Sequence, residues 1–248
     1  MGENEKQSEN RGTSCSSSAE GRPSKDLHRK AFGGLLFLLL VMATLLFIPA
    51  WTLDYWQAWA FLAVFGASAL AITLYLMKKD PKLLERRVYA GPNAEKETSQ
   101  KIIQTISSIG FTAILVVSAL DHRFARMPLP LYVFLAGDAL VALGFFIVFL
   151  VYKENTFASA TIELAPEQKV ISTGLYKLVR HPMYMGAFFL LVGLPLSLGS
   201  CWGLFVIALM MPALIWRLLD EEKFLAKNLP GYTEYQNTVR HRLVPFIW

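Results

Sequence analysis

The chain alternates between long uncharged apolar stretches and short polar segments. Residues 31–53, 55–77 and 102–120 carry no charged side chain, and residues 127–152 carry only Asp138. A charge at the centre of a bilayer costs about 3 kcal/mol, and about 20 apolar residues cross the hydrocarbon core as a helix. The pattern therefore predicts four membrane-spanning helices in the first part of the chain.

A fifth uncharged stretch, residues 181–216, is too long for one span. As a single helix its 36 residues would run roughly 54 Å, against a hydrocarbon core about 30 Å thick. Glycine and serine interrupt the stretch at residues 198–201, so the chain is expected to turn back there. The expected fold class is all-α: a polytopic membrane protein with about six transmembrane helices, of which the last two form a hairpin.

The basic residues predict the orientation in the membrane. Of the 24 Lys and Arg residues, only Arg123 and Arg126 fall on one side of the predicted spans, and the other 22 fall on the opposite side. Cytoplasmic loops carry the excess of basic residues, so both termini are expected to be cytoplasmic. Asp54, Asp121 and His122 are expected, with Arg123, to be ordinary loop residues on the far side.

The chain divides into three expected regions. Residues 1–29 are rich in Ser, Gly, Glu and Lys and predict a disordered cytoplasmic tail. Residues 30–152 form a four-helix transmembrane region, and residues 153–248 combine a polar connection, the helical hairpin and a C-terminal tail. With 54% hydrophobic and 17% charged residues, the composition excludes an ordinary soluble domain or a disordered chain.

Composition also limits the partners. The net charge is +5, but the basic residues form no stripe on a soluble face, which argues against nucleic acid. Cys15 and Cys201 lie in very different surroundings and predict neither a disulfide nor a metal site. No glycine-rich dinucleotide turn, Walker loop or zinc-protease motif is present, so soluble cofactor folds are excluded.

A first polar cluster precedes the predicted hairpin. Pro182 suits the first position of a helix, which places Arg180 and His181 just outside the helix start. A helix N-terminus carries partial positive charge and free N–H groups, so this arrangement predicts a site for a carboxylate or phosphate. The alternative is that Arg180 is a basic flanking residue and His181 a cap, with Tyr184 and Gly186 as interface and packing residues.

A second polar cluster follows the hairpin. Arg217 and Glu221 are four residues apart and share a helix face, and Glu222 lies about 100° further round. Acidic residues near a helix C-terminus oppose its dipole, so they suggest a role beyond helix stability, although an exposed ion pair is the alternative. Asp138 is a third candidate: either a functional ionisable group in the membrane or a neutral Asp that packs two helices.

Taken in order, these residues resemble the superfamily of isoprenylcysteine carboxyl methyltransferases and phospholipid methyltransferases. The resemblance covers roughly residues 150–248. The residues that carry it are Asn155, Ser172 to Tyr176, Arg180 to Gly186, Arg217 with Glu221 and Glu222, Pro230 to Tyr232, and Tyr235.

The resemblance implies an integral membrane enzyme that uses S-adenosylmethionine and needs no metal. By position, Arg180, His181, Tyr184 and Gly186 would belong to the cofactor pocket. Glu221 and Glu222 would form its other wall, and Tyr176 and Tyr184 could attract the sulfonium through their ring faces.

The resemblance also implies catalytic roles for two residues. Arg217 would position the acceptor, and Glu222 or Glu221 would act as a base for an amine. The acceptor is lipophilic, such as the carboxylate of a prenylated cysteine or a lipid amine, and the partners are membrane lipid or a lipidated substrate.

Two other classes of function remain open from the sequence. A membrane reductase of the sterol or steroid type has a similar C-terminal pattern but binds a nicotinamide cofactor. A non-catalytic transporter or scaffold is the second alternative. The candidate residues cluster at one membrane face and do not line a path across it, which argues against transport.

Overall fold

The computed structural model describes residues 25–88, 97–125, 129–158, 161–162, 164, 167–244 and 248. Within these residues the chain is helical and contains no strand, so the predicted all-α class is confirmed. Nearly all of the tail expected over residues 1–29 lies outside the described residues, as do Cys15 and Arg126. The helices are α1 (Lys25–Ala50), α2 (Trp56–Lys79), α3 (Pro81–Val88), α4 (Thr98–Phe124), α5 (Leu131–Glu154), α6 (Pro182–Leu198), α7 (Cys201–Asn228) and α8 (Tyr232–Thr238).

Five of these helices, α1, α2, α4, α5 and α7, have the length and composition of membrane spans. They include the four spans predicted from the uncharged stretches. The sixth expected span corresponds to α6, which is apolar but has only 17 residues, the lower limit for crossing a bilayer.

The predicted hairpin turn lies between α6 and α7. Gly199 ends α6 with a φ of 75°, a left-handed conformation that glycine adopts without steric cost. Ser200 then caps α7, because its side chain accepts a hydrogen bond from the Gly203 backbone N–H. Pro182 is the first residue of α6, as predicted, and α7 continues to Asn228.

The residues at the C-terminal end of α4 are helical and partly buried, whereas they were expected to form an exposed loop on the far side of the membrane. Asp121, His122 and Arg123 were expected in a loop, but α4 extends to Phe124. Asp121 is buried and accepts a 2.8 Å hydrogen bond from the Ser200 hydroxyl. The Tyr55 ring stacks on His122, and its hydroxyl donates to the Leu198 carbonyl at 2.9 Å. These contacts join α4 to the hairpin turn. Although polar side chains are typical of a loop, burial and hydrogen bonding keep these residues in the helix.

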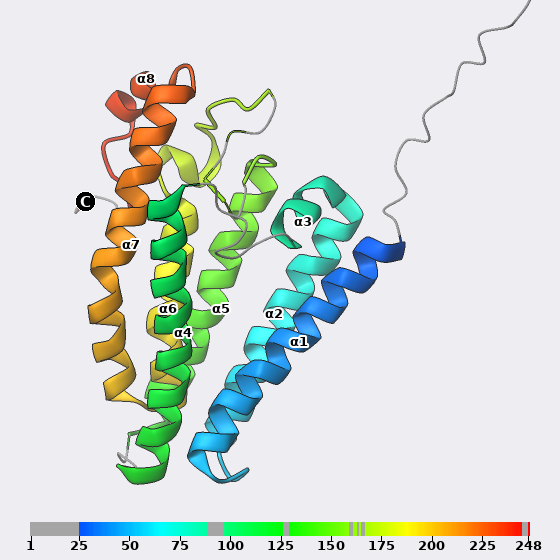
Figure 1. Ribbon diagram of the computed structural model, residues 1–248, viewed down its shortest axis with the longest axis vertical. Coiled ribbons are helices and arrows are strands. Elements are labelled where there is room, and N and C mark those ends of the chain that lie inside the picture. Colours follow the sequence, from blue (N-terminus) through cyan, green and yellow to red (C-terminus); the bar gives the residue numbers. More distant parts are fainter. Residues whose placement is uncertain are drawn as a thin grey trace, which may run out of the picture.

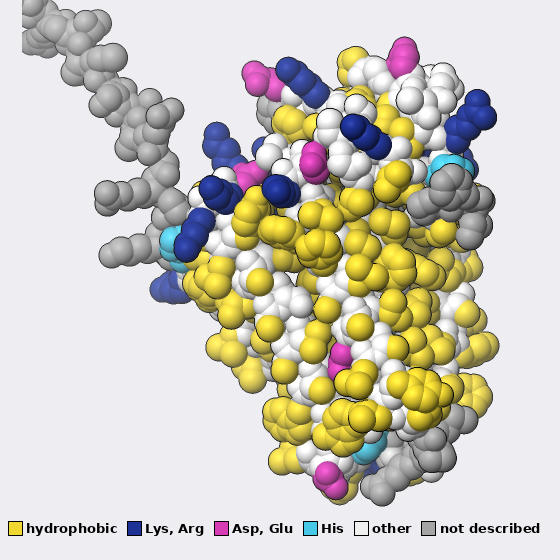
Figure 2. Space-filling model, turned by 180° about the vertical axis from the view of Figure 1, so that it is seen from behind, with side chains coloured by type: hydrophobic (Ala, Val, Ile, Leu, Met, Phe, Trp, Pro, Cys, Tyr) yellow, Lys and Arg dark blue, Asp and Glu magenta, His cyan; other side chains and the backbone are white. Residues whose placement is uncertain are grey.

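The long helices run side by side, with α3, α8 and the connection between α5 and α6 gathered at one end (Figure 1). Helices α4, α5, α6 and α7 pack together, while α1 packs on α4 and α2 packs on α5. Apolar side chains cover the middle of the bundle, and most Lys and Arg side chains in view lie at the end that carries α3 and α8 (Figure 2). The structure thus describes an integral membrane protein; that this polar end faces the cytoplasm stays a prediction.

Glycines allow α5 and α6 to approach very closely. A Cβ added at Gly144 would lie 2.6 Å from the Gly186 carbonyl oxygen, and one added at Gly193 would lie 2.7 Å from the Gly137 carbonyl oxygen. Backbone atoms block both positions, so the helix pair must separate to accept a larger side chain. This packing fixes α6, and therefore its N-terminal end, against the rest of the bundle.

We expect Gly144→Ala to destabilise the protein. Forcing a methyl group into a closely packed contact typically costs about 1–3 kcal/mol, so the melting temperature in detergent should fall. Gly34→Ala is the matched control, because a Cβ there meets nothing within 4 Å and alanine favours helix over glycine. Equal melting temperatures for the two variants would contradict the role of the α5–α6 contact.

Candidate active site

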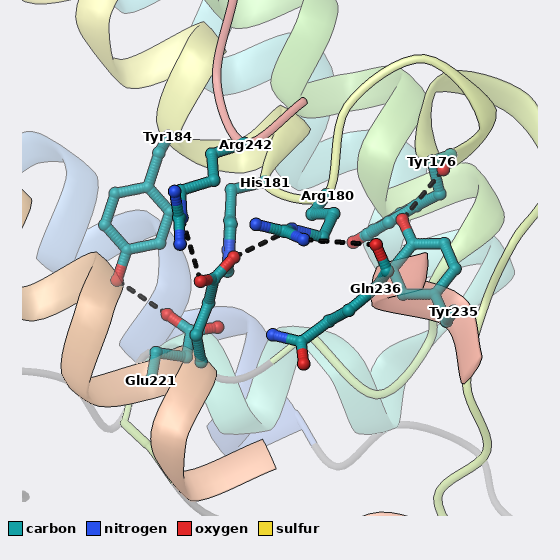
Figure 3. A network of polar contacts seen from close by, with 9 residues as sticks. Tyr176, Arg180, His181, Tyr184, Glu221, Tyr235, Gln236 and Arg242 are labelled. Atoms are coloured by element: carbon teal, nitrogen blue, oxygen red, sulfur yellow. Dashed lines mark hydrogen bonds and ion pairs between the residues drawn. The ribbon is translucent and has the colours of Figure 1, made fainter. Parts of the chain in front are cut away.

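A buried carboxylate, that of Glu222, organises the polar end of the bundle. Its Oε1 lies 2.8 Å from Arg180 Nε and 3.2 Å from His181 Nε2. Its Oε2 accepts a 2.9 Å hydrogen bond from Arg242 Nε. The three basic side chains, which Figure 3 labels, come from the segment before α6 and from the C-terminal tail. Glu222 therefore joins α7 to both.

The tail also pairs with the segment before α6 through its backbone. The N–H groups of Arg180 and His181 donate to the carbonyls of His241 and Arg242, both at 2.9 Å. The contact satisfies backbone groups that would otherwise be buried without partners. It therefore fixes the two side chains that precede α6 in one orientation.

A tyrosine cluster supports the connection between α5 and α6. Tyr176, on a short 3₁₀ turn η2 (Gly174–Lys177), accepts a 2.9 Å hydrogen bond from the Asn155 side chain at the end of α5. The Tyr235 hydroxyl on α8 donates to the Tyr176 carbonyl at 2.7 Å. Burial raises the pKa of Tyr176 to about 12, against the opposing effect of the Asn155 hydrogen bond. Tyr176 is therefore a neutral, fixed wall residue at physiological pH.

These elements enclose a cavity of about 420 Å³. This volume is within the range of small-molecule and cofactor sites. Most of the predicted site residues line the cavity, namely Tyr176, Arg180, His181, Tyr184, Arg217 and Glu221. The first turn of α6 also faces it through Met183 and Tyr184, and first-turn N–H groups have no helical acceptor. The cavity thus combines cationic and N–H donor groups with a carboxylate.

The two neighbouring glutamates take different roles. Glu221 lines the cavity and accepts a 2.6 Å hydrogen bond from the Tyr184 hydroxyl. Glu222 is buried against its three basic partners and is not among the residues that line the cavity. The expectation placed Glu222 on the wall opposite Arg180 and His181, whereas the structure places it in direct contact with both. The reason is that successive residues of a helix point about 100° apart.

Gly186 and Asp138 also lie away from the cavity. Gly186 is buried on the side of α6 that contacts α5, which assigns it to helix packing. Asp138 lies within α5, and its Oδ1 has no hydrogen-bond partner among the described residues. Neither residue lines the cavity.

Sequence reasoning missed Arg242 and Gln100. Arg242 lies in the tail without any recognisable motif, and its distance from Glu222 becomes apparent only in the folded chain. Gln100 is buried on α4 and accepts a 2.9 Å hydrogen bond from Arg217 Nη1. A signal for Gln100 did exist, because Gln100, Gln104 and Ser107 are spaced four and three residues apart and share a helix face.

A small apolar hollow adjoins the main cavity between α6 and α7. It measures about 40 Å³, and Tyr184, Ala187 and Leu214 line both spaces. Phe188, Leu191 and Trp248 contribute to its apolar lining. A hydrophobic group can therefore lie beside the polar cavity without contacting its charged residues.

The geometry describes a helical membrane protein with a cofactor-sized polar cavity where its apolar bundle ends. The sequence profile of the phospholipid methyltransferase family matches residues 132–230. This segment therefore matches a family within the superfamily of integral membrane methyltransferases, as the ordered residue set predicted. A search of curated proteins finds none that matches the chain.

We expect Glu222→Gln to disrupt the polar end of the protein. Removing one member of a buried ion pair leaves uncompensated charge and typically costs about 3–5 kcal/mol, so the melting temperature in detergent should fall. Glu234→Gln, on the exposed side of α8, is the matched control and should behave like the wild type. An unchanged melting temperature in Glu222→Gln would show that the ion-pair cluster does not stabilise the site.

Proposed function

We propose that the protein transfers a methyl group from S-adenosylmethionine to a lipophilic acceptor. The supporting observation is the 420 Å³ cavity, which places Arg180 and His181 beside the start of α6 and Glu221 on a neighbouring wall. The family of residues 132–230 supports a methyltransferase that acts on lipid.

The residues of the cavity fit the charge distribution of this cofactor. S-adenosylmethionine carries a carboxylate, an ammonium group and a sulfonium. His181 and the first-turn N–H groups of α6 suit the carboxylate, and Glu221 suits the cationic groups. The ring of Tyr184, beside Glu221, can add cation–π attraction of about 0.5–2 kcal/mol. When bound, the cofactor supplies an electrophilic methyl group.

Orientation of the acceptor accounts for most of the expected rate enhancement. Holding two reacting groups in line can contribute about 7–11 kcal/mol. Arg217 is placed to orient an acceptor in the cavity, and Glu221 is placed to accept a proton from an amine. Glu222 acts through Arg180, His181 and Arg242, so we assign it a positioning role in place of the catalytic one expected from the sequence.

The location of the cavity suits a reaction between a water-soluble and a lipophilic compound. The residues that line the cavity belong to the polar end of the bundle, where most Lys and Arg side chains in view lie (Figure 2). The adjoining hollow, about 40 Å³, is almost entirely apolar and lies between α6 and α7, so a short part of the hydrocarbon chain of an acceptor can contact it. The reaction partners can therefore arrive from water and from membrane.

We expect the purified protein to bind S-adenosylmethionine in detergent, measured by isothermal titration calorimetry. His181→Ala should weaken this binding about tenfold, because it removes a hydrogen-bond donor from the cavity. His28→Ala removes the same side chain from α1 and should leave the affinity unchanged. Transfer of radiolabel from the methyl group of the cofactor to lipid, protein or small molecules in membranes then identifies the acceptor.

A protein that binds NADPH and ignores S-adenosylmethionine would contradict the proposal and favour a reductase. A protein that binds neither cofactor would favour the non-catalytic alternative. If His181→Ala binds S-adenosylmethionine with wild-type affinity, the proposed carboxylate site at the start of α6 is contradicted.

A further inference from the structure

The cavity has a polar wall that lies outside the family-matched segment. Gln104 and Ser107 of α4 line the cavity, and α4 precedes residues 132–230. Gln100 lies one turn earlier on the same face of α4, since residues four and seven positions apart superpose on a helix. The three side chains form one polar stripe, which we call the α4 wall.

Gln100 joins the α4 wall to α7 through both ends of its amide. Its side-chain oxygen accepts from Arg217 Nη1 at 2.9 Å, and its side-chain nitrogen donates to Asp220 Oδ2 at 3.0 Å. Gln100 is only 3% exposed, so water does not compete for these bonds. The amide therefore fixes the direction in which the Arg217 guanidinium enters the cavity.

Ser107 provides a separate indication of a ligand. Its hydroxyl is buried in the cavity wall, and it has no hydrogen-bond partner among the described residues. A buried polar group without a partner costs free energy, and a bound polar group would remove that cost. Ser108, the next residue, is exposed and donates to the Gln104 carbonyl at 2.8 Å, so the lack of a partner is specific to the cavity side.

We infer that the α4 wall receives the polar headgroup of the methyl acceptor and that Gln100 positions Arg217 for it. Arg217 and the Ser107 hydroxyl both offer donors, and a guanidinium matches an oxyanion in shape as well as charge. The carboxylate or phosphate of that headgroup therefore lies against Arg217 and Ser107. This inference rests on the proposed function, because it assumes a methyl acceptor in the cavity.

The test measures transfer from S-adenosylmethionine to two probes in detergent micelles. N-acetyl-S-farnesylcysteine presents a carboxylate, and phosphatidylethanolamine presents a phosphate with an amine. Gln100→Leu should lower kcat/KM for the methylated probe at least tenfold, while the affinity for S-adenosylmethionine stays within twofold of wild type. The unchanged cofactor affinity distinguishes this result from a failure of the proposed function, which would abolish cofactor binding in the wild type.

A double variant separates positioning from a general structural role. Gln100→Glu places two carboxylates together and should lose activity, whereas Gln100→Glu combined with Asp220→Asn restores a donor opposite the new carboxylate. The double variant should recover kcat/KM to within about threefold of wild type. An inactive double variant with wild-type cofactor affinity and melting temperature would overturn the positioning role of Gln100.

A pair of neighbouring serines tests the wall without disturbing Gln100. Ser107→Ala should raise the acceptor KM about two- to tenfold, as expected for one lost hydrogen bond, and Ser108→Ala should not change it. Identical kinetics for the two variants would overturn the inference. So would a wild-type protein that binds S-adenosylmethionine but methylates neither probe.

Discussion

The polar end of this protein depends on the neutralisation of buried charge at Glu222. Its carboxylate contacts Arg180, His181 and Arg242, and a buried ion is tolerated only when such partners surround it. The requirement brings α7, the start of α6 and the tail into one arrangement. Because Glu222 contacts these partners, the adjacent Glu221 points about 100° away from them and faces the cavity. This rotation separates the carboxylate in the cavity from the buried ion-pair cluster.

Much of the fold could be predicted from the sequence because its signals are local. The cost of charge in a bilayer marks the spans, Pro182 marks a helix start, and Gly199 with Ser200 marks the turn. The pairing of Arg242 with Glu222 has no such signal, since it depends on the path of the tail. The burial of Asp121 against Ser200 could likewise not be predicted from the sequence, because a polar residue near a span end is usually exposed.

The candidate site was predictable to a similar extent and for similar reasons. Arg180, His181, Tyr184 and Glu221 form recognisable local patterns, and all four line one cavity. Glu222 and Gly186 belong to the same patterns, but neither lines the cavity. Glu222 points toward its basic partners, and Gly186 contacts α5. The polar stripe of α4 had the correct spacing, yet Gln and Ser near the end of a span are equally typical of an interfacial surface.

The contact of the tail with the segment before α6 has a consequence for biosynthesis. The spanning helices emerge from the ribosome first and can enter the membrane while residues 241–242 are still unsynthesised. Until those residues arrive, the backbone N–H groups of Arg180 and His181 lack their acceptors and Glu222 lacks Arg242. A nascent chain would therefore be membrane-inserted before Arg180, His181 and Glu222 are fixed, so the synthesis of residues 241–242 controls when the site takes its final shape.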